Sequence, residues 1–188
     1  MIDFDGLFEE FCAEHDLDIV FSDNMPAGYE TANGTFDVTQ RTLFLNRVQI
    51  AAFPEYEQLF YFFHELRHAL QYLHPERFDA EIQRSRYYSV MYDGTCYVLS
   101  DGEWRECQLT GGEETFTALY LGQPYEVDAN TYAYEKVRAR CGDSEGLREL
   151  ASFWIPQCPP AFSEYRRLYA ELDRRVGSAC PESRDGAI

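Results

Sequence analysis

His64-Glu65-Leu66-Arg67-His68 is the stretch that decides the fold, because two histidines four residues apart on a helix point to the same side. Two such imidazoles can share one zinc ion, and Glu65 is then placed to hold a metal-bound water. Imidazole is a good zinc ligand at neutral pH, and zinc lowers the pKa of its bound water to roughly 7. The stretch therefore predicts a zinc site in which the Glu65 carboxylate takes a proton from water.

The surrounding residues predict a long helix that is buried on most sides. Pro54 and Pro75 are signals for its start and its end, and apolar residues occupy every face across residues 59–73. Imidazole and charged side chains are costly to bury there unless they are paired or bound to metal. The alternative is that both histidines are hydrogen-bonded core residues and that Glu65 pairs with Arg67 or another cation.

A catalytic zinc takes three protein ligands and keeps one open position, so a third ligand must come from elsewhere in the chain. Glu126 is the first candidate, because Pro124 suits a first helical turn and Glu126 begins a stripe that continues at helical spacing through Ala129 and Ala133. The alanines would let this helix come close to the helix of the two histidines. The alternative is that Glu126 and Asp128 are acidic residues favoured near a positive helix N-terminus.

His74 is the second candidate for the third ligand, because it follows His68 by six residues, as the third histidine does in metzincins. Met91 and its neighbours also resemble the methionine turn of that family. Gln71, however, stands where metzincins have a turning glycine, and glutamine favours a continuing helix. A continuing helix would turn His74 about 240° from His68, out of reach of the same ion. We therefore expect His74 near the helix C-terminus, where a protonated imidazole is favourable.

Two Asp-Gly pairs predict tight turns at residues 93–94 and 101–102 and divide residues 87–109 into a three-stranded β-meander. With two-residue turns, Met91 lies inside the first strand, and one side of the meander is apolar and needs covering. The residues expected on that side are Tyr88, Val90, Tyr97, Leu99 and Trp104.

The cysteines predict free thiols rather than a disulfide framework. The register of the second turn places Cys96 opposite Cys107, close enough for a disulfide. The other four cysteines are scattered without a C-x-x-C spacing, and the first residues are acidic where a signal peptide would be basic and then apolar. We expect a cytoplasmic protein with free thiols and without a second, structural zinc site.

Length and charge limit the class of protein. A chain of 188 residues with 45% apolar content can build one sizeable core, so we expect a single domain over residues 1–177, with C-terminal helices and a tail at 178–188. No apolar run approaches the roughly 18 residues needed to cross a membrane. The net charge of −17 argues against nucleic acid and anionic membrane surfaces as partners, whereas a basic peptide substrate would suit it.

The order of these motifs resembles the ImmA/IrrE-type gluzincin-like metallopeptidases, one group of zincins. The resemblance covers residues 17–137. It depends on Gly28-Tyr29, Leu43-Phe44-Leu45-Asn46, the His64-to-His68 stretch and Glu126-x-x-Ala129-Asn130. The chain departs from the group at two points. The segment between His68 and Glu126 is longer, because the meander is inserted there. Arg67 also replaces a small residue that is common before the second histidine. No DNA-binding helix-turn-helix accompanies the site.

The resemblance implies an α+β protein with a minimal zincin fold. A small mixed or antiparallel sheet would pack on the active-site helix, and its edge strand would hold an extended substrate. The resemblance further implies His64, His68 and Glu126 as the ligands of one Zn²⁺ per chain, with Glu65 as general base.

These observations predict a zinc metallopeptidase that hydrolyses peptide bonds of a protein or peptide substrate. Zinc would polarise the scissile carbonyl, Glu65 would pass the proton of water to the leaving amine, and a tyrosine could stabilise the oxyanion. The alternative is a non-catalytic interaction or regulatory protein on a zincin scaffold, although such a protein has no need of Glu65. Arg67 has two interpretations, either holding a carboxylate such as Asp128 behind the metal ligands or forming a core ion pair.

Overall fold

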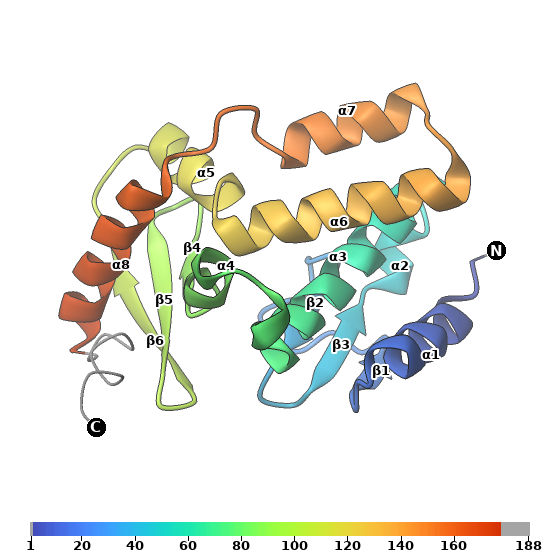
Figure 1. Ribbon diagram of the computed structural model, residues 1–188, viewed down its shortest axis with the longest axis horizontal. Coiled ribbons are helices and arrows are strands. Elements are labelled where there is room, and N and C mark those ends of the chain that lie inside the picture. Colours follow the sequence, from blue (N-terminus) through green and yellow to red (C-terminus); the bar gives the residue numbers. More distant parts are fainter. Residues whose placement is uncertain (1, 178–188) are drawn as a thin grey trace. The chain divides into compact units, whose positions relative to one another are not determined.

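The structure of the protein is a computed structural model that describes residues 2–177, and it is a mixed α+β fold (Figure 1). Within these residues there are eight α-helices and two sheets of three strands each, which confirms the predicted α+β class. The chain groups into two compact units. Unit 1 comprises the residues up to Phe78 together with Asp128–Ile155, and unit 2 comprises Asp79–Val127 and the residues from Pro156 onward. The predicted tail at 178–188 lies outside the described residues, and a single domain over 1–177 stays a prediction.

Unit 1 contains a small mixed sheet that packs against one long helix. Its strands are β1 (Val20–Ser22), β2 (Gly34–Asp37) and β3 (Thr42–Leu45). The order is β1-β3-β2, in which β1 runs parallel and β2 antiparallel to the central β3. All four residues of β3 are buried, as expected for the middle strand of a covered sheet. Helix α3 (Glu55–Leu73) packs on β2 and β3.

Helix α3 has the predicted position and burial. It follows Pro54 and ends at His74, so the chain stays helical through Gln71. Most of its residues between Leu59 and Gln71 are buried, and the ring of Phe62 contacts those of Phe4 and Phe21. The apolar residues on all its faces therefore have partners, which is the physical reason for a helix without a polar side.

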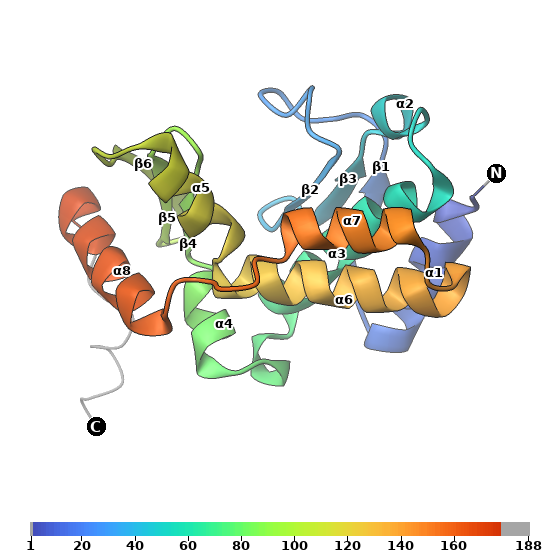
Figure 2. The same ribbon diagram turned by 90° about the horizontal axis from the view of Figure 1, so that it is seen from above.

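The other helices of unit 1 lie around α3 and the sheet (Figures 1 and 2). Helix α6 begins within unit 2, and most of its residues belong to unit 1. Its predicted stripe is fully buried at Ala129, Ala133 and Val137. No helix in the described part of the chain is both long and apolar enough to cross a membrane. The bounds are α1 (Phe4–His15), α2 (Arg47–Ile50), η1 (Pro75–Arg77), α6 (Pro124–Cys141) and α7 (Glu145–Trp154).

Unit 2 has its own core between a β-meander and two helices. The strands β4 (Tyr88–Val90), β5 (Thr95–Ser100) and β6 (Glu103–Gln108) are antiparallel neighbours in that order. Buried residues of the strands pack against α5 (Glu113–Leu121) and α8 (Phe162–Val176). The short helix α4 (Ala80–Ser85) precedes β4. The core residues are Tyr88, Val90, Cys96, Val98, Phe116, Tyr165, Tyr169 and Leu172.

The second turn of the meander has the predicted register, whereas the first does not. Leu99 pairs with Trp104 and Cys96 with Cys107, as a two-residue turn at Asp101-Gly102 requires. Between β4 and β5, however, Val90 pairs with Cys96 and not with Tyr97. The loop there has three residues and is closed by the Met91 N–H, which donates to the Thr95 carbonyl over 2.7 Å.

The extra loop residue corrects the predicted apolar face. A shift of one residue moves every side chain of a strand to the other side of the sheet. Tyr88 and Val90 therefore share the buried face with Cys96 and Val98, instead of with Tyr97 and Leu99. Trp104, also predicted on that face, is 41% exposed. Met91 follows the end of β4 and does not lie inside a strand.

The five described cysteines are free thiols. Cys96 lies opposite Cys107 as predicted, and burial raises the pKa of the Cys96 thiol to about 12. Because the thiolate is the reactive form, this buried thiol is inert at neutral pH. Cys180 lies outside the described residues.

The three-residue turn can be tested at Gly94. Its φ is +82°, and an added Cβ would lie 2.6 Å from Cε2 of Phe116 and 3.0 Å from the Leu109 carbonyl oxygen. Gly102 has the same φ but no neighbour within 4 Å, so it is a matched control. We expect Gly94→Ala to reduce the free energy of unfolding by about 2–4 kcal/mol, and Gly102→Ala by only about 1–2 kcal/mol. Chemical denaturation measures both, and equal losses would contradict the crowded turn.

Candidate metal centre

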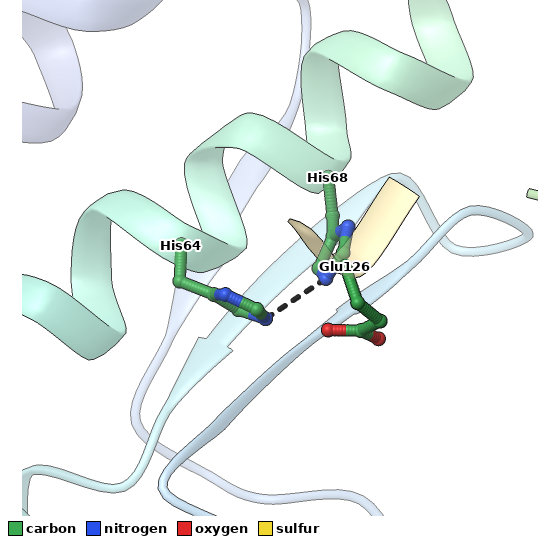
Figure 3. Close-up of side chains that lie close together, drawn as sticks. All are labelled: His64, His68 and Glu126. Carbon is green, nitrogen blue, oxygen red and sulfur yellow. Dashed lines mark hydrogen bonds between the residues drawn. The ribbon is translucent and has the colours of Figure 1, made fainter. Parts of the chain in front are cut away.

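Helix α3 presents His64 and His68 on one side, as their spacing of four residues predicts (Figure 3). Their Nε2 atoms are 2.9 Å apart. Glu126, from the first turn of α6, brings its carboxylate to the same place. One ligand atom from each of the three residues lies within 4.8 Å of the others, and both His68 and Glu126 are buried. The structure thus brings together all three predicted metal ligands.

Helix α6 holds Glu126 through contacts on both sides of it in the sequence. The N–H of Tyr125, a donor of the first helical turn, bonds to the Ser85 hydroxyl over 2.9 Å. Such a donor has no partner within its own helix, so the Ser85 hydroxyl stabilises the start of α6. Two residues after Glu126, the Asp128 carboxylate accepts hydrogen bonds from Arg67 of α3. Glu126 thus lies in a helical turn whose neighbouring residues on both sides are hydrogen-bonded.

Arg67 pairs with Asp128, a contact that fits both interpretations of this residue. The guanidinium donates from Nε to Oδ2 over 2.7 Å and from Nη2 to Oδ1 over 2.9 Å, in a two-pronged ion pair. Its Cζ lies 4.5 Å from the ring centroid of Phe78 and 4.7 Å from that of Tyr132. The planar fork and the two rings leave the guanidinium little freedom to turn. Asp128 also accepts a hydrogen bond from Gln71, and Gln71 contacts His68. The Arg67–Asp128 pair is therefore linked to the predicted ligand His68 through one side chain.

Glu65, the predicted general base, is only 9% exposed and points toward the sheet. A Cβ added at Gly34, the first residue of β2, would lie 2.8 Å from Cγ of Glu65 and 3.1 Å from the Phe44 carbonyl oxygen. Gly34 is therefore the residue that gives Glu65 its room. The sequence did not single out Gly34, because Glu65 lies 31 positions further along the chain.

His74, the other candidate ligand, lies elsewhere. It caps the C-terminus of α3, and its Nδ1 is 3.2 Å from the Glu76 carboxylate. The helix continues through Gln71, as glutamine favours, and His74 is absent from the group of ligand atoms that contains His68. The metzincin spacing is thus present in the sequence without bringing the third histidine to the other two.

Tyr92 is a residue near Glu126 that the sequence did not single out. Burial raises the pKa of its hydroxyl, and the negative charge of Glu126 raises it further. Its ring lies 4.5 Å from the ring of Tyr120, and a hydrogen bond with Tyr120 acts in the opposite direction on the pKa. Tyr92 is consequently a neutral hydroxyl within electrostatic reach of a predicted ligand. Because 34 residues separate the two in the chain, local patterns hold no signal for this proximity.

Comparison with protein-family models, with curated proteins and with solved structures found no significant match. Any functional interpretation therefore depends on the geometry of the site itself.

Proposed function

We propose that this protein is a zinc-dependent metallopeptidase of the zincin type, with His64, His68 and Glu126 as ligands of one Zn²⁺ and Glu65 as general base. The observation that carries the proposal is the convergence of the three ligand groups from two helices, with Glu65 next to the first histidine in the chain. Two imidazoles and one carboxylate are a common donor set of catalytic zinc sites, and three protein ligands leave one position for water or substrate.

The donor set favours zinc over the abundant hard cations. Calcium and magnesium prefer ligand sets made of oxygen atoms, whereas imidazole suits zinc and other transition metals. A bound cation would compensate the charge of the Glu126 carboxylate, which is 6% exposed, beside His68, which is 7% exposed.

The mechanism assigns one task to each group. Zinc held by His64, His68 and Glu126 would supply Lewis acidity, which acidifies water and polarises a carbonyl. Glu65 takes the proton of the attacking water and delivers it to the nitrogen of the leaving amine. The neutral hydroxyl of Tyr92 is a candidate donor to the oxyanion, because it is within electrostatic reach of Glu126.

The substrate in this proposal is an extended peptide. Strand β2 is at the edge of its sheet, so one row of its backbone groups is available to pair with another extended chain. Its first residue, Gly34, touches Glu65, so a peptide along β2 would run past the general base. The net charge of −17 favours a basic peptide, and it argues against nucleic acid and anionic membranes as partners. A cytoplasmic location remains part of the proposal.

The competing function is a binding module that keeps the site without catalysis. Zinc-loaded protein incubated with a diverse peptide pool, analysed by mass spectrometry, separates the two. The peptidase cleaves peptides at defined positions, and Glu65→Gln suppresses the cleavage. A wild type that has full zinc occupancy and cleaves nothing, basic peptides included, would be a binding module.

Gly34 provides a prediction about the general base. In Gly34→Ala the new methyl group must displace the Glu65 side chain, and a shift of about 1 Å at a reacting group can cost about 100-fold in rate. We expect peptide turnover to fall about 10–100-fold while zinc content stays the same. Gly112→Ala is the control, because nothing lies within 4 Å of Gly112. Full turnover by a folded Gly34→Ala protein would show that the contact with Glu65 has no bearing on catalysis.

A further inference from the structure

A continuous set of hydrogen bonds runs from His68 to Arg67 through two intermediate side chains. Nδ1 of His68 is 2.7 Å from Oε1 of Gln71. Nε2 of Gln71 donates to Oδ2 of Asp128 over 2.8 Å. Asp128 in turn accepts both bonds of the Arg67 guanidinium. The set joins α3 to α6, and it is buried at His68 and Gln71.

The chemistry of each group fixes the direction of every bond. An ionised carboxylate only accepts hydrogen bonds, so Gln71 must turn its NH₂ group toward Asp128. The carbonyl oxygen of Gln71 then faces His68, and a carbonyl oxygen also only accepts. Nδ1 of His68 must therefore carry a proton. In a neutral imidazole with a proton on Nδ1, the other nitrogen, Nε2, carries none, so its lone pair can bind a metal.

We propose that Gln71 and Asp128 are positioning residues that hold His68 in the Nδ1–H tautomer with Nε2 directed at the metal position. We call the set of hydrogen bonds from His68 through Gln71 and Asp128 to Arg67 the relay. Arg67 anchors it, because its two bonds fix the Asp128 carboxylate and the rings of Phe78 and Tyr132 restrict rotation of the guanidinium plane. The functional meaning of the relay rests on the proposed zinc site, whereas the tautomer itself does not. Partners behind a metal ligand typically contribute 10–100-fold to metal affinity.

The relay gives a role to Arg67 and Gln71, two polar residues of α3. Both side chains converge on Asp128, which lies two residues beyond Glu126 in α6. One carboxylate thus orients His68 through Gln71 and also ties α3 to the helix that carries Glu126.

The tautomer of His68 can be measured without metal or substrate. Protein labelled with ¹⁵N-histidine and stripped with a chelator gives long-range ¹H–¹⁵N correlations that identify the protonated nitrogen of each ring. The four histidines are assigned by single His→Gln variants. We expect wild-type His68 to carry its proton on Nδ1. A proton on Nε2 of His68 would overturn the proposal without any further variant.

Substitutions at position 71 test whether the tautomer depends on the acceptor. Gln71→Leu should move His68 toward the Nε2–H tautomer and weaken zinc binding about 10–100-fold. Gln71→Glu should keep the Nδ1–H tautomer, because its carboxyl group still accepts from His68. Gln58→Leu is the matched control, since Gln58 lies on the same helix and bonds instead to the Phe53 carbonyl. An unchanged His68 tautomer in folded Gln71→Leu would refute the relay.

A double-mutant cycle tests whether Asp128 acts through Gln71. If it does, Asp128→Ala should weaken zinc binding, and the double variant with Gln71→Leu should bind zinc no more weakly than Gln71→Leu alone. Additive losses would show that Asp128 does not act through Gln71, and would overturn that part of the proposal. A protein that binds zinc but cleaves no peptide would remove the proposed function and leave the tautomer and affinity results standing.

Discussion

Replacing Glu65 with glutamine should leave the zinc content of the protein unchanged and reduce peptide hydrolysis at least about 100-fold. Glutamine has the same shape as glutamate, so it fits the narrow space beside Gly34 and preserves the packing of α3. It cannot take a proton from water, and a positioned general base typically contributes 10²–10⁴-fold. Turnover of a peptide identified as a substrate, compared at matched zinc occupancy, measures the effect.

Glu57→Gln is the appropriate control for this substitution. Glu57 lies on the same helix and is bonded to the Tyr61 hydroxyl, away from the ligand group. It should therefore retain turnover close to that of the wild type. Equal turnover by the Glu65→Gln and wild-type proteins would refute the general-base role, whereas equal losses from both glutamate substitutions would point to a general effect of removing charge from α3.

Removal of any one metal ligand should abolish stoichiometric zinc binding. We expect about one zinc per wild-type chain, and at least about 100-fold weaker binding in His64→Ala, His68→Ala and Glu126→Ala, since even partners behind a ligand contribute 10–100-fold. A site that binds only the folded protein also stabilises it, so zinc should raise the melting temperature of the wild type and not that of these variants. Metal analysis after dialysis and thermal unfolding with and without zinc measure both effects.

His74→Ala is the control that separates the two possible third ligands. Its imidazole is paired with Glu76 at the end of α3, so the variant should bind zinc as the wild type does. The opposite pattern, with zinc lost in His74→Ala and retained in Glu126→Ala, would replace the proposed site with the metzincin interpretation. Retention of zinc in every variant would remove the site altogether.

The sequence by itself determined the features that depend on local backbone geometry. The helix of the two histidines begins after Pro54 and ends before Pro75, as predicted, because prolines and helix formers act on the residues next to them. The spacing of four residues in a helix is enough to place His64 and His68 together. The same reasoning disfavoured His74, since a helix that continues through Gln71 turns it away.

Glu126 was predicted less directly, because the sequence offered a helical stripe without a partner for it. Its approach to His64 and His68 depends on packing between residues about 60 positions apart. The buried alanines of α6 made the prediction possible, since small side chains on one face indicate a close neighbour. The stripe did not identify that neighbour. The helix of His64 and His68 was chosen because the zinc site needs a third ligand.

Only the tertiary structure decided the contacts that orient the site. The bonds from Asp128 to Arg67 and Gln71, and the approach of Gly34 to Glu65, join residues 31 to 61 positions apart, and no periodic pattern connects them. The β4–β5 register likewise depended on one residue of loop length, which composition does not reveal. Local sequence determines the direction in which a side chain points from its own helix or strand, whereas tertiary packing determines which residues it contacts.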